Sequence, residues 1–360
     1  GASVPIRSLG VKRKFVPPYV KKEEQGGNVP NFVRKALTSN DEKGRVELPE
    51  RLRNCEPKLV EMITNEILDR SPEVKWDDIA GLDFAKQSVR EVVVWPLLRP
   101  DLFQGLRGPP KGILLFGPPG TGKTLIGKAI ASESGARFFS ISASSLTSKW
   151  HGEGEKLVRT LFAVAATQQP SIIFIDEIDS LLSQRTDSEY DATRRIKTEF
   201  LVQLDGAATS ADERVLVVGT TPDDSPTGAT NRPHELDDAA RRRLVKRLYI
   251  PLPGDEARID LLRRVMRNEN HALSPEDFHV IVKRTDGYSG ADVRALCTEA
   301  AMGPIRSVSD IRCLDKGNVR PINLQDFECG LRQVRPSVSQ KDLVQYIAWN
   351  DHYGSFPTKS

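Results

Sequence analysis

The chain has 360 residues, of which 38% are hydrophobic and 28% are charged, and its formal net charge is +3. This composition predicts a globular protein with room for two or three domains, and no apolar run approaches the roughly 18 to 20 residues of a membrane-spanning helix. The beginning shows no signal peptide, and the four cysteines have no CxxC spacing. We therefore expect a reducing compartment, with neither a disulfide framework nor a zinc site.

Residues 1–50 are rich in proline, glycine, serine and charge, which predicts a mostly disordered tail. Eight Lys or Arg against two acids in residues 1–35 concentrate the basic character of the chain there. This basic segment contains an aromatic residue and a proline pair, in the run Phe15, Val16, Pro17 and Pro18. The run could belong to a nuclear address, an extended docking peptide or plain solvated linker. The abrupt tail also suggests a fragment of a longer protein.

Residues 51–253 have the pattern of an α/β domain. A linker helix is predicted after Pro57, because apolar residues recur at helical spacing up to Ser71-Pro72, and another helix is expected around residues 83–95. Apolar runs then alternate with helical ones, which indicates a mainly parallel sheet. The predicted strands are 113–116, 138–141, 172–175, 215–218 and 248–250.

Residues 254–336 show no strand pattern and predict a small helical domain, followed by a terminal segment at 337–360. Ser274 to Asp277 and Ser289 to Asp292 resemble capping boxes at helix starts. In the terminal helix we expect Tyr346 and Trp349 to anchor it on the sheet domain. The predicted helices lie near 255–268, 275–284, 289–302, 324–334 and 339–350.

The most informative stretch follows the apolar run 113–116. A strand, a glycine-rich loop and a helix succeed one another there, as a phosphate-binding loop requires. Glycines let backbone N–H groups face the phosphates, and the helix presents its positive end to them. We expect Lys123 to reach the phosphates and the Thr124 hydroxyl to ligate Mg²⁺, which makes ATP and Mg²⁺ the predicted cofactors. The loop comprises Gly117, Pro118, Pro119, Gly120, Thr121, Gly122, Lys123, Thr124 and Leu125.

A second half of the nucleotide site is predicted where the apolar run 172–175 ends in two acids, Asp176 and Glu177. Asp176 is expected in the magnesium shell, and Glu177 is expected to polarise the attacking water. An apolar strand that ends in two acids is common by itself. Its place roughly fifty residues after the phosphate loop makes it specific.

Several motifs together resemble those of AAA ATPases of the meiotic clade, the group of fidgetin, spastin and katanin. The resemblance covers the chain from about Glu56 to its end and is strongest to the fidgetin branch. It implies a P-loop domain with a parallel five-stranded sheet, followed by a small all-α lid domain. The motifs that carry the resemblance to the clade are Asp78 to Gly81, Gly117 to Thr124, Asp176 to Asp179, Gly228 to Pro233 and Ala239 to Arg243. Those that narrow it to the fidgetin branch are Ser142 to Trp150, Thr198 to Gly206 and Val334 to Ser339.

The resemblance implies roles for single residues. Asn231 matches the asparagine that orients the attacking water, and Arg242 and Arg243 match arginine fingers that act on the nucleotide of a neighbouring subunit. Activity then implies a nucleotide-dependent ring, a homo-hexamer by resemblance. Four further residues are expected at the nucleotide: Ile79, Ala80, Gly290 and Ala291.

The resemblance also places two pore loops. Lys149, Trp150 and His151 match the first, where an exposed Trp can grip an extended peptide without reading its sequence. The charged segment 185–195 occupies the position of the second. The chain departs from the family pattern at His151, where an aliphatic residue is usual, so the contacts inside the pore are expected to differ or to become sensitive to pH.

A more serious departure is an apparent insertion at 220–228, between Gly219 and the Ala229-Thr230-Asn231 motif. Pro222 and Pro226 make this segment a loop. Two outcomes stay open: the loop bulges out harmlessly, or it draws Asn231 away from the γ-phosphate.

These features predict an ATP-driven motor that threads polypeptide through a ring. By resemblance its substrate is a filament of a RecA-class recombinase, docked through the tail run Phe15 to Pro18, in homologous-recombination repair in the nucleus, with the cytoplasm as the alternative location. Microtubule severing through tubulin tails is the second prediction, and a nucleotide-gated adaptor with little hydrolysis is the third. We expect no membrane partner and no direct sequence-specific contact with nucleic acid, because residues 56–360 hold no groove of aromatic and basic residues.

Overall fold

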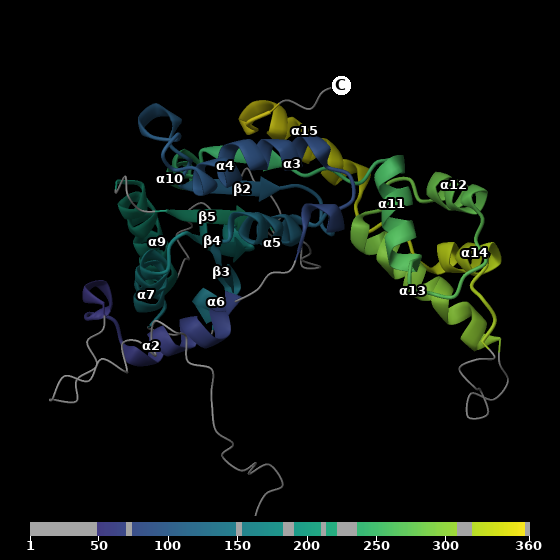
Figure 1. Cartoon of the computed structure of the whole chain (residues 1–360), viewed down its shortest axis with the longest axis horizontal. Helices are drawn as coiled ribbons and strands as arrows, with labels where there is room; N and C mark the ends of the chain where they lie inside the picture. Colours follow the sequence, from purple (N-terminus) through teal and green to yellow (C-terminus); the bar gives the residue numbers. More distant parts are fainter. Residues whose placement is uncertain are drawn as a thin grey trace, which may run out of the picture. The chain divides into compact units, whose positions relative to one another are not determined.

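The computed structural model describes residues 49–69, 74–148, 153–182, 191–209, 214–221, 236–307 and 319–356, all within the unit Pro49–Ser360 (Figure 1). Several sequence predictions lie outside these residues and stay predictions. They are the tail with Phe15, Val16, Pro17 and Pro18, the pore residues Lys149, Trp150 and His151, residues 185–190 of the second pore loop, and Asn231.

A six-stranded sheet in the order β1-β3-β4-β5-β2-β6 forms the centre of the large domain. Five of these strands are parallel to one another, as predicted. All but the edge strand β6 are rich in Val, Ile, Leu or Phe, the residues that pack well on a sheet buried on both faces. The five are β2 (Gly112–Phe116), β3 (Arg137–Ser142), β4 (Ser171–Asp176), β5 (Val215–Thr220) and β6 (Lys246–Tyr249).

The sixth strand, β1 (Leu68–Asp69), corrects the prediction that the linker helix continues to Ser71-Pro72. The helix α2 (Pro57–Met62) passes into a π-helical turn at Ile63–Ile67 and stops there. Leu68 and Asp69 then pair antiparallel with β3. The open edge of β3 offers a ladder of hydrogen bonds that outweighs the local helical pattern.

Helices pack on both faces of the sheet. On one face, α3 (Asp83–Val89), the π-helical turn at Arg90–Val94, α4 (Trp95–Leu98) and α5 (Lys123–Ser134) share a buried apolar cluster with alternate strand residues such as Ile113 and Phe174. The strand residues between them point to the opposite face, where α7 (Gly154–Thr167) lies against β4 and packs on α9 (Asp191–Thr209) through Phe162 and Phe200. The short helices are α6 (Ala143–Ser148), α8 (Ile178–Leu182) and α10 (Asp238–Arg243).

The lid domain after Pro253 is helical, as predicted. Ser274 and Ser289 accept hydrogen bonds from the backbone N–H groups of Asp277 and Asp292, so both predicted capping boxes are confirmed. One apolar core holds the lid helices together. These helices are α11 (Asp255–Met266), α12 (Pro275–Arg284), α13 (Gly290–Arg306) and α14 (Leu324–Gln333).

The last helix, α15 (Gln340–Tyr353), packs on the sheet domain, as expected from its aromatic residues. The ring of Trp349 lies 4.4 Å from that of Phe116 at the end of β2. Beyond the helix, the N–H of Ser355 donates to the carbonyl of Arg247 in β6 at 2.8 Å. In the part of the chain that the structure describes, no helix is long and apolar enough to cross a membrane.

Candidate nucleotide site

The phosphate loop lies between the carboxyl end of β2 and the first turn of α5, as predicted. Two of its glycines are required by geometry. Gly117 has φ 143°, and a Cβ there would lie 2.2 Å from the carbonyl oxygen of Ile250. Gly120 has φ 67°, and a Cβ there would lie 2.7 Å from the Cβ of Ala291 in the lid. The loop therefore keeps its shape only with glycine at both positions.

The side chains of the loop are held by its own backbone. Lys123 is almost fully buried, and its Nζ donates to the carbonyls of Pro118 at 2.9 Å and Gly117 at 3.2 Å. The hydroxyl of Thr121 donates to the same carbonyl of Pro118. These bonds curl the loop around the ammonium group, which fits a group that binds phosphate. Thr124 is half-buried in the first turn of α5, beside the exposed Leu125.

The two carboxylates lie where β4 ends, and both are partly buried. Asp176 accepts a hydrogen bond from the hydroxyl of Thr220, which lies at the end of the neighbouring strand β5. Glu177 has φ 55°, in the left-handed region that non-glycine residues rarely adopt. Such strain costs of the order of 1–3 kcal/mol and is found mainly at functional sites. The hydroxyl of Ser142, at the end of β3, lies 3.5 Å from Glu177 Oε2.

Thr220 and Ser142 were not among the predicted site residues. Sequence analysis placed Thr220 at the start of an insertion, but the structure places it inside β5, fully buried. The next residue, Thr221, continues that run by donating its N–H to the carbonyl of Leu115. The strand thus extends past the predicted end at residue 218, and Thr220 and Thr221 belong to the sheet edge rather than to an insertion. The two β-branched residues after Gly219, Thr220 and Thr221, were the sequence signal for this longer strand.

The lid contributes its α13 start to the phosphate loop. The N–H of Ala291 donates to the carbonyl of Gly120 at 3.2 Å, and Gly290 packs against the same carbonyl. Ser289 caps this helix, and its side chain occupies the space that a Cβ at position 120 would need. The structure therefore brings Gly290 and Ala291 to the phosphate loop, and their contact with the nucleotide stays a prediction.

The segment before α3 is buried beside the same domain core. Ile79 and Ala80 are each less than a tenth exposed. The segment is fixed upstream by the indole N–H of Trp76, which donates to Glu133 of α5. Downstream, Gly81 approaches the lid so closely that a Cβ there would lie 2.7 Å from the Cβ of Ala257.

The two predicted finger arginines differ in their surroundings. Arg243 Nε donates to Asp205 of α9 at 2.6 Å, and Arg243 Nη1 donates to the carbonyl of Ala239. The hydrogen bond from this guanidinium holds the pKa of the Asp205 carboxyl below its usual range. Arg242 is exposed at the end of α10. Arg242 is therefore the arginine that is placed to reach out of this chain.

The donor set fits a nucleotide with a divalent cation. A glycine loop that a Cβ would fill, a buried lysine bound to that loop, and a threonine hydroxyl at a helix start form an anion cradle. Thr124 and Asp176 supply the hard oxygen ligands that Mg²⁺ prefers. We therefore expect these two residues to hold the ion and the loop to hold the phosphates.

Comparison with known proteins agrees with this geometry. Residues 113–252 match the model of the ATPase family associated with various cellular activities (AAA), and residues 275–319 match the AAA+ lid domain. A crystal structure of the FIGL-1 AAA domain in complex with ADP superposes with a TM-score of 0.77 and 52% identity, over 85% of this chain and 99% of that one. The chain belongs to the AAA ATPase family.

Among AAA ATPases the chain is similar to the fidgetin, spastin and katanin group. It is 59% identical to fidgetin-like protein 1 of Rattus norvegicus over 97% of this chain and 50% of the relative, so it spans about half the length of that relative. A structure described as the basis for katanin self-assembly has a TM-score of 0.67 and 39% identity, over 82% of this chain and 97% of that one. Residues 307–354 match the Vps4 C terminal oligomerisation domain. The predicted family and its fidgetin branch are thus confirmed.

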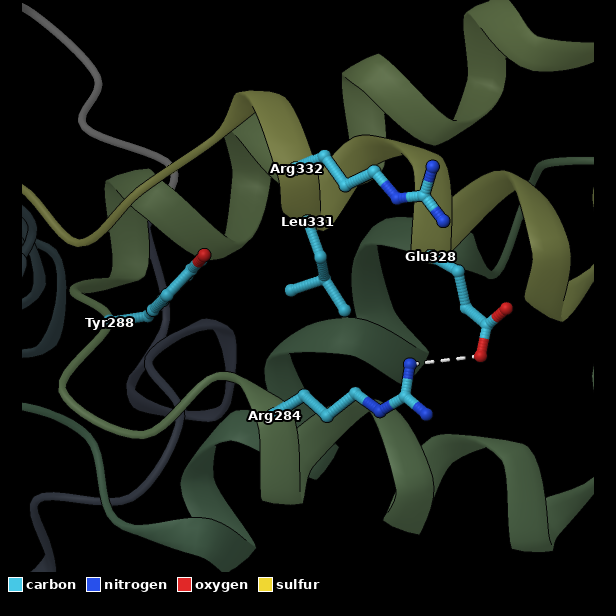
Figure 2. Close-up of a pocket in the computed structure, with 5 residues that line it drawn as sticks. All are labelled: Arg284, Tyr288, Glu328, Leu331 and Arg332. Carbon is cyan, nitrogen blue, oxygen red and sulfur yellow. Dashed lines mark hydrogen bonds and ion pairs between the residues drawn. The ribbon is translucent and has the colours of Figure 1, made fainter.

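A separate hollow of about 390 Å³ lies on the lid and shares no residue with the phosphate loop. Figure 2 shows Leu331 pointing into it, with Arg284 of α12 paired to Glu328 of α14 at 2.8 Å on one side. On the other side the hydroxyl of Tyr288 donates to the carbonyl of Val334 at 2.6 Å. The ion pair joins α12 to α14, and the Tyr288 bond joins the turn between α12 and α13 to the residue that follows α14, which indicates a part in holding the lid together.

Proposed function

We propose that this chain is an ATP-driven protein-remodelling motor that works as an oligomeric ring and threads polypeptide through its pore. The observation that carries the proposal is the contact of the lid residue Ala291 with Gly120 in the phosphate loop of the large domain. A nucleotide on that loop would touch both domains. Hydrolysis of that nucleotide would therefore change the contacts that hold the lid in place. A lid that moves can shift the neighbouring subunit of the ring.

Each group has a role in this proposal. Lys123 and the loop N–H groups bind the phosphates, and Thr124 and Asp176 hold Mg²⁺, which when bound neutralises charge on the transferred phosphoryl group. Glu177 accepts the proton of the attacking water, and Ser142 and the strained backbone orient its carboxylate. Thr220 orients Asp176. Asn231 orients the water, and Arg242 stabilises the charge on the nucleotide of the next subunit.

Self-association has two lines of support. The terminal part of the chain matches an oligomerisation domain, and the katanin structure is described by its self-assembly. In addition, Trp95, Leu98, Leu102 and Leu106 are each half-exposed or more within one stretch of the large domain. A run of exposed apolar side chains marks an interaction surface. A second copy of this chain is the partner we propose, in a homo-hexamer that nucleotide stabilises.

The proposed substrate is a filament of a RecA-class recombinase, and the proposed setting is homologous-recombination repair in the nucleus. The motivation is the similarity to fidgetin-like protein 1 together with the aromatic and proline pair in the tail, Phe15 to Pro18. A pull-down of recombinase with the whole chain and with Phe15→Glu tests it. Unchanged binding in the variant would remove the docking role.

Microtubule severing is the second proposal, because exposed Arg194 and Arg195 at the start of α9 could attract acidic tubulin tails. Lys156 of α7 is a further basic residue that could attract such tails, but its pairing with Glu56 weakens its part in this proposal. A tubulin-tail pull-down with and without added salt discriminates the two substrates. Salt-sensitive capture that Arg194→Ala abolishes would favour severing.

The test of the motor itself is ATP hydrolysis measured against protein concentration, for this chain and for Glu177→Gln. A rate per subunit that climbs with concentration and vanishes in the variant is the expected result, because a finger in trans needs a neighbour. A flat, negligible rate despite measurable ATP binding would overturn the motor. The nucleotide-gated adaptor would then be favoured, with the loop after Thr221 as the cause of the lost hydrolysis.

A further inference from the structure

One carboxylate oxygen in the lid, Oδ2 of Asp292, joins two segments that lie 45 residues apart in the sequence. Asp292 is 8% exposed and belongs to the first turn of α13, where its Oδ2 accepts from the N–H of Ser289 at 2.9 Å. The same oxygen accepts from the backbone N–H of Ser337 at 3.2 Å and from the Ser337 hydroxyl at 2.9 Å. A capping box needs only the first of these three bonds. The two bonds from Ser337 therefore fasten a second segment to the start of α13.

The other serine capping box of the lid has no such link. Asp277 of α12 accepts from the N–H of Ser274 at 2.8 Å, and in the described part of the chain it has no hydrogen-bond partner from another segment. Asp277 is also only half-buried, whereas Asp292 is buried. The link to Ser337 is therefore a property of the α13 start and not of the caps of the lid in general.

The start of α13 is also a part of the lid that contacts the phosphate loop. The N–H of Ala291 donates to the carbonyl of Gly120 at 3.2 Å, and a Cβ at Gly120 would lie 2.8 Å from Oγ of Ser289. Ser289 and Ala291 belong to the same helix start as Asp292. A nucleotide that shifts the phosphate loop would therefore shift the helix start that holds Ser337.

Ser337 leads directly into the last helix, because Ser339 caps α15. Ser337 and α15 both lie within residues 307–354, which match the oligomerisation domain. One face of α15 packs on the sheet domain, but Val344 is 65% exposed and Ile347 is 40% exposed on the same helix. Two exposed apolar side chains three residues apart are neighbours on a helix surface. Together with the match, they make α15 a surface for a second copy of this chain.

We propose that Asp292 is a positioning residue that couples nucleotide binding to self-association, because it fastens the segment leading to α15 to the helix start that touches the phosphate loop. The inference rests on the proposed function, since it takes the phosphate loop to bind nucleotide and the chain to assemble with copies of itself. It deepens that function by naming the hydrogen bonds through which the nucleotide acts on assembly.

The link is strong for its size because its acceptor is charged. A hydrogen bond to a carboxylate is roughly twice as strong as one between neutral groups. Asp292 is buried, so water does not readily replace a donor that is lost. Without the Ser337 hydroxyl, the backbone N–H is the remaining donor from this segment to Asp292. The segment would then follow the helix start less closely, so nucleotide binding would persist while its effect on assembly weakens.

The test measures assembly of the whole chain by sedimentation velocity, without nucleotide and with a saturating ATP analogue that is not hydrolysed. The ratio of the two dissociation constants of assembly reports the coupling. For Ser337→Ala we expect this ratio to fall about tenfold, the size of one hydrogen bond to a charged group. The affinity of unassembled chains for the analogue should stay within twofold of normal. Ser337→Thr keeps the hydroxyl and should keep the ratio.

Ser307→Ala is the matched control. The hydroxyl of Ser307 also belongs to the lid, but it donates to the carbonyl of Pro304 in the same helix end and joins no second segment. This variant should assemble as the unaltered chain does, with and without nucleotide.

An unchanged ratio in Ser337→Ala would overturn the inference, and so would an equal loss in Ser307→Ala or in Ser337→Thr. Assembly that weakens by the same factor with and without nucleotide would overturn it too, since a purely structural role gives that result. Failure of the unaltered chain to bind nucleotide or to assemble would instead overturn the proposed function.

Two further variants test the charge of the link. If Ser337→Ala does not fold in a thermal melt, Ser337→Asp takes its place, because a second carboxylate beside Asp292 repels it and should lower the ratio at least as far. No fall in the ratio would overturn the inference equally. Asp292→Asn keeps the size of the side chain and loses its charge, and its effect on the ratio should not add to that of the change at Ser337. Strict additivity of the two changes would contradict a shared link.

Discussion

The phosphate-loop edge of the sheet and the end of α10 hold their functional residues in opposite ways. At the edge, Lys123, Asp176 and Glu177 are each fixed by hydrogen bonds or backbone geometry within this chain. At α10, Arg243 is occupied by Asp205 while Arg242 is exposed. In the proposed function, one chain therefore builds the binding half of the site by itself, and the exposed Arg242 is completed as a finger by contact with a neighbour. Nucleotide binding and nucleotide hydrolysis should separate experimentally along this line.

The largest expected effect is that of Arg242→Ala, which should lower the rate of ATP hydrolysis by about 10³ or more while leaving nucleotide affinity nearly unchanged. The measurement is steady-state hydrolysis beside equilibrium binding, with the exposed Arg267→Ala as control. Mixing this variant with Glu177→Gln subunits should restore part of the activity, since an intact Glu177 then meets an intact Arg242. No recovery in the mixture would contradict a finger acting in trans.

Glu177→Gln should lower hydrolysis by roughly 10² to 10⁴, because the amide cannot accept the proton of water. The amide retains the size of the carboxylate, so ATP binding should persist. Gel filtration with ATP should show a more stable assembly than that of the unaltered chain, since bound ATP is no longer consumed. Hydrolysis at the normal rate would remove Glu177 from its proposed role.

Gly120→Ala probes the junction between the loop and the lid. The added Cβ would lie 2.7 Å from that of Ala291 at a backbone φ of 67°, so we expect a cost of about 1–3 kcal/mol in nucleotide binding. Isothermal titration with ADP measures it. Gly206→Ala is the matched control, because a Cβ there meets open space on α9. Equal affinities for both variants would show that the lid contact does not support the loop.

Thr220→Val removes the hydroxyl that orients Asp176 and keeps the shape of the side chain. We expect the free energy of unfolding to fall by about 1–3 kcal/mol, because the partly buried carboxylate of Asp176 loses its hydrogen-bond donor. The concentration of Mg²⁺ needed for half-maximal hydrolysis should rise as well. Thr298→Val, at an exposed helix position, serves as control. A normal Mg²⁺ requirement would place Thr220 in a purely structural role.

The smallest effect concerns the lid alone. Arg284→Ala breaks the exposed pair with Glu328 and should lower the stability to thermal unfolding by about 1 kcal/mol or less. Hydrolysis should stay within twofold of normal. A large loss of activity without loss of stability would indicate instead that this face of the lid contacts a neighbouring subunit.

Much of the fold could be predicted because its signals are local. The five parallel strands, the capping boxes at Ser274 and Ser289 and the glycine loop each depend on a few adjacent residues. The β1 strand was missed, because two residues carry no pattern of their own and gain their hydrogen bonds only from β3. The site roles of Thr220 and Ser142 were missed for the same reason, since each acts on a residue far away in sequence.

The sequence by itself determined the chemistry of this protein: a phosphate loop, two carboxylates at a strand end and a pair of arginines, each set by side-chain type and short spacing. Only the tertiary structure decided which of these groups meet. Three contacts show this: Arg243 donates to Asp205, Ala291 donates to Gly120, and Lys86 donates to Ile79. The first two join separate elements, and the third spans a strained turn. Such contacts form when packed surfaces bring distant segments together, and no local pattern of residues records them.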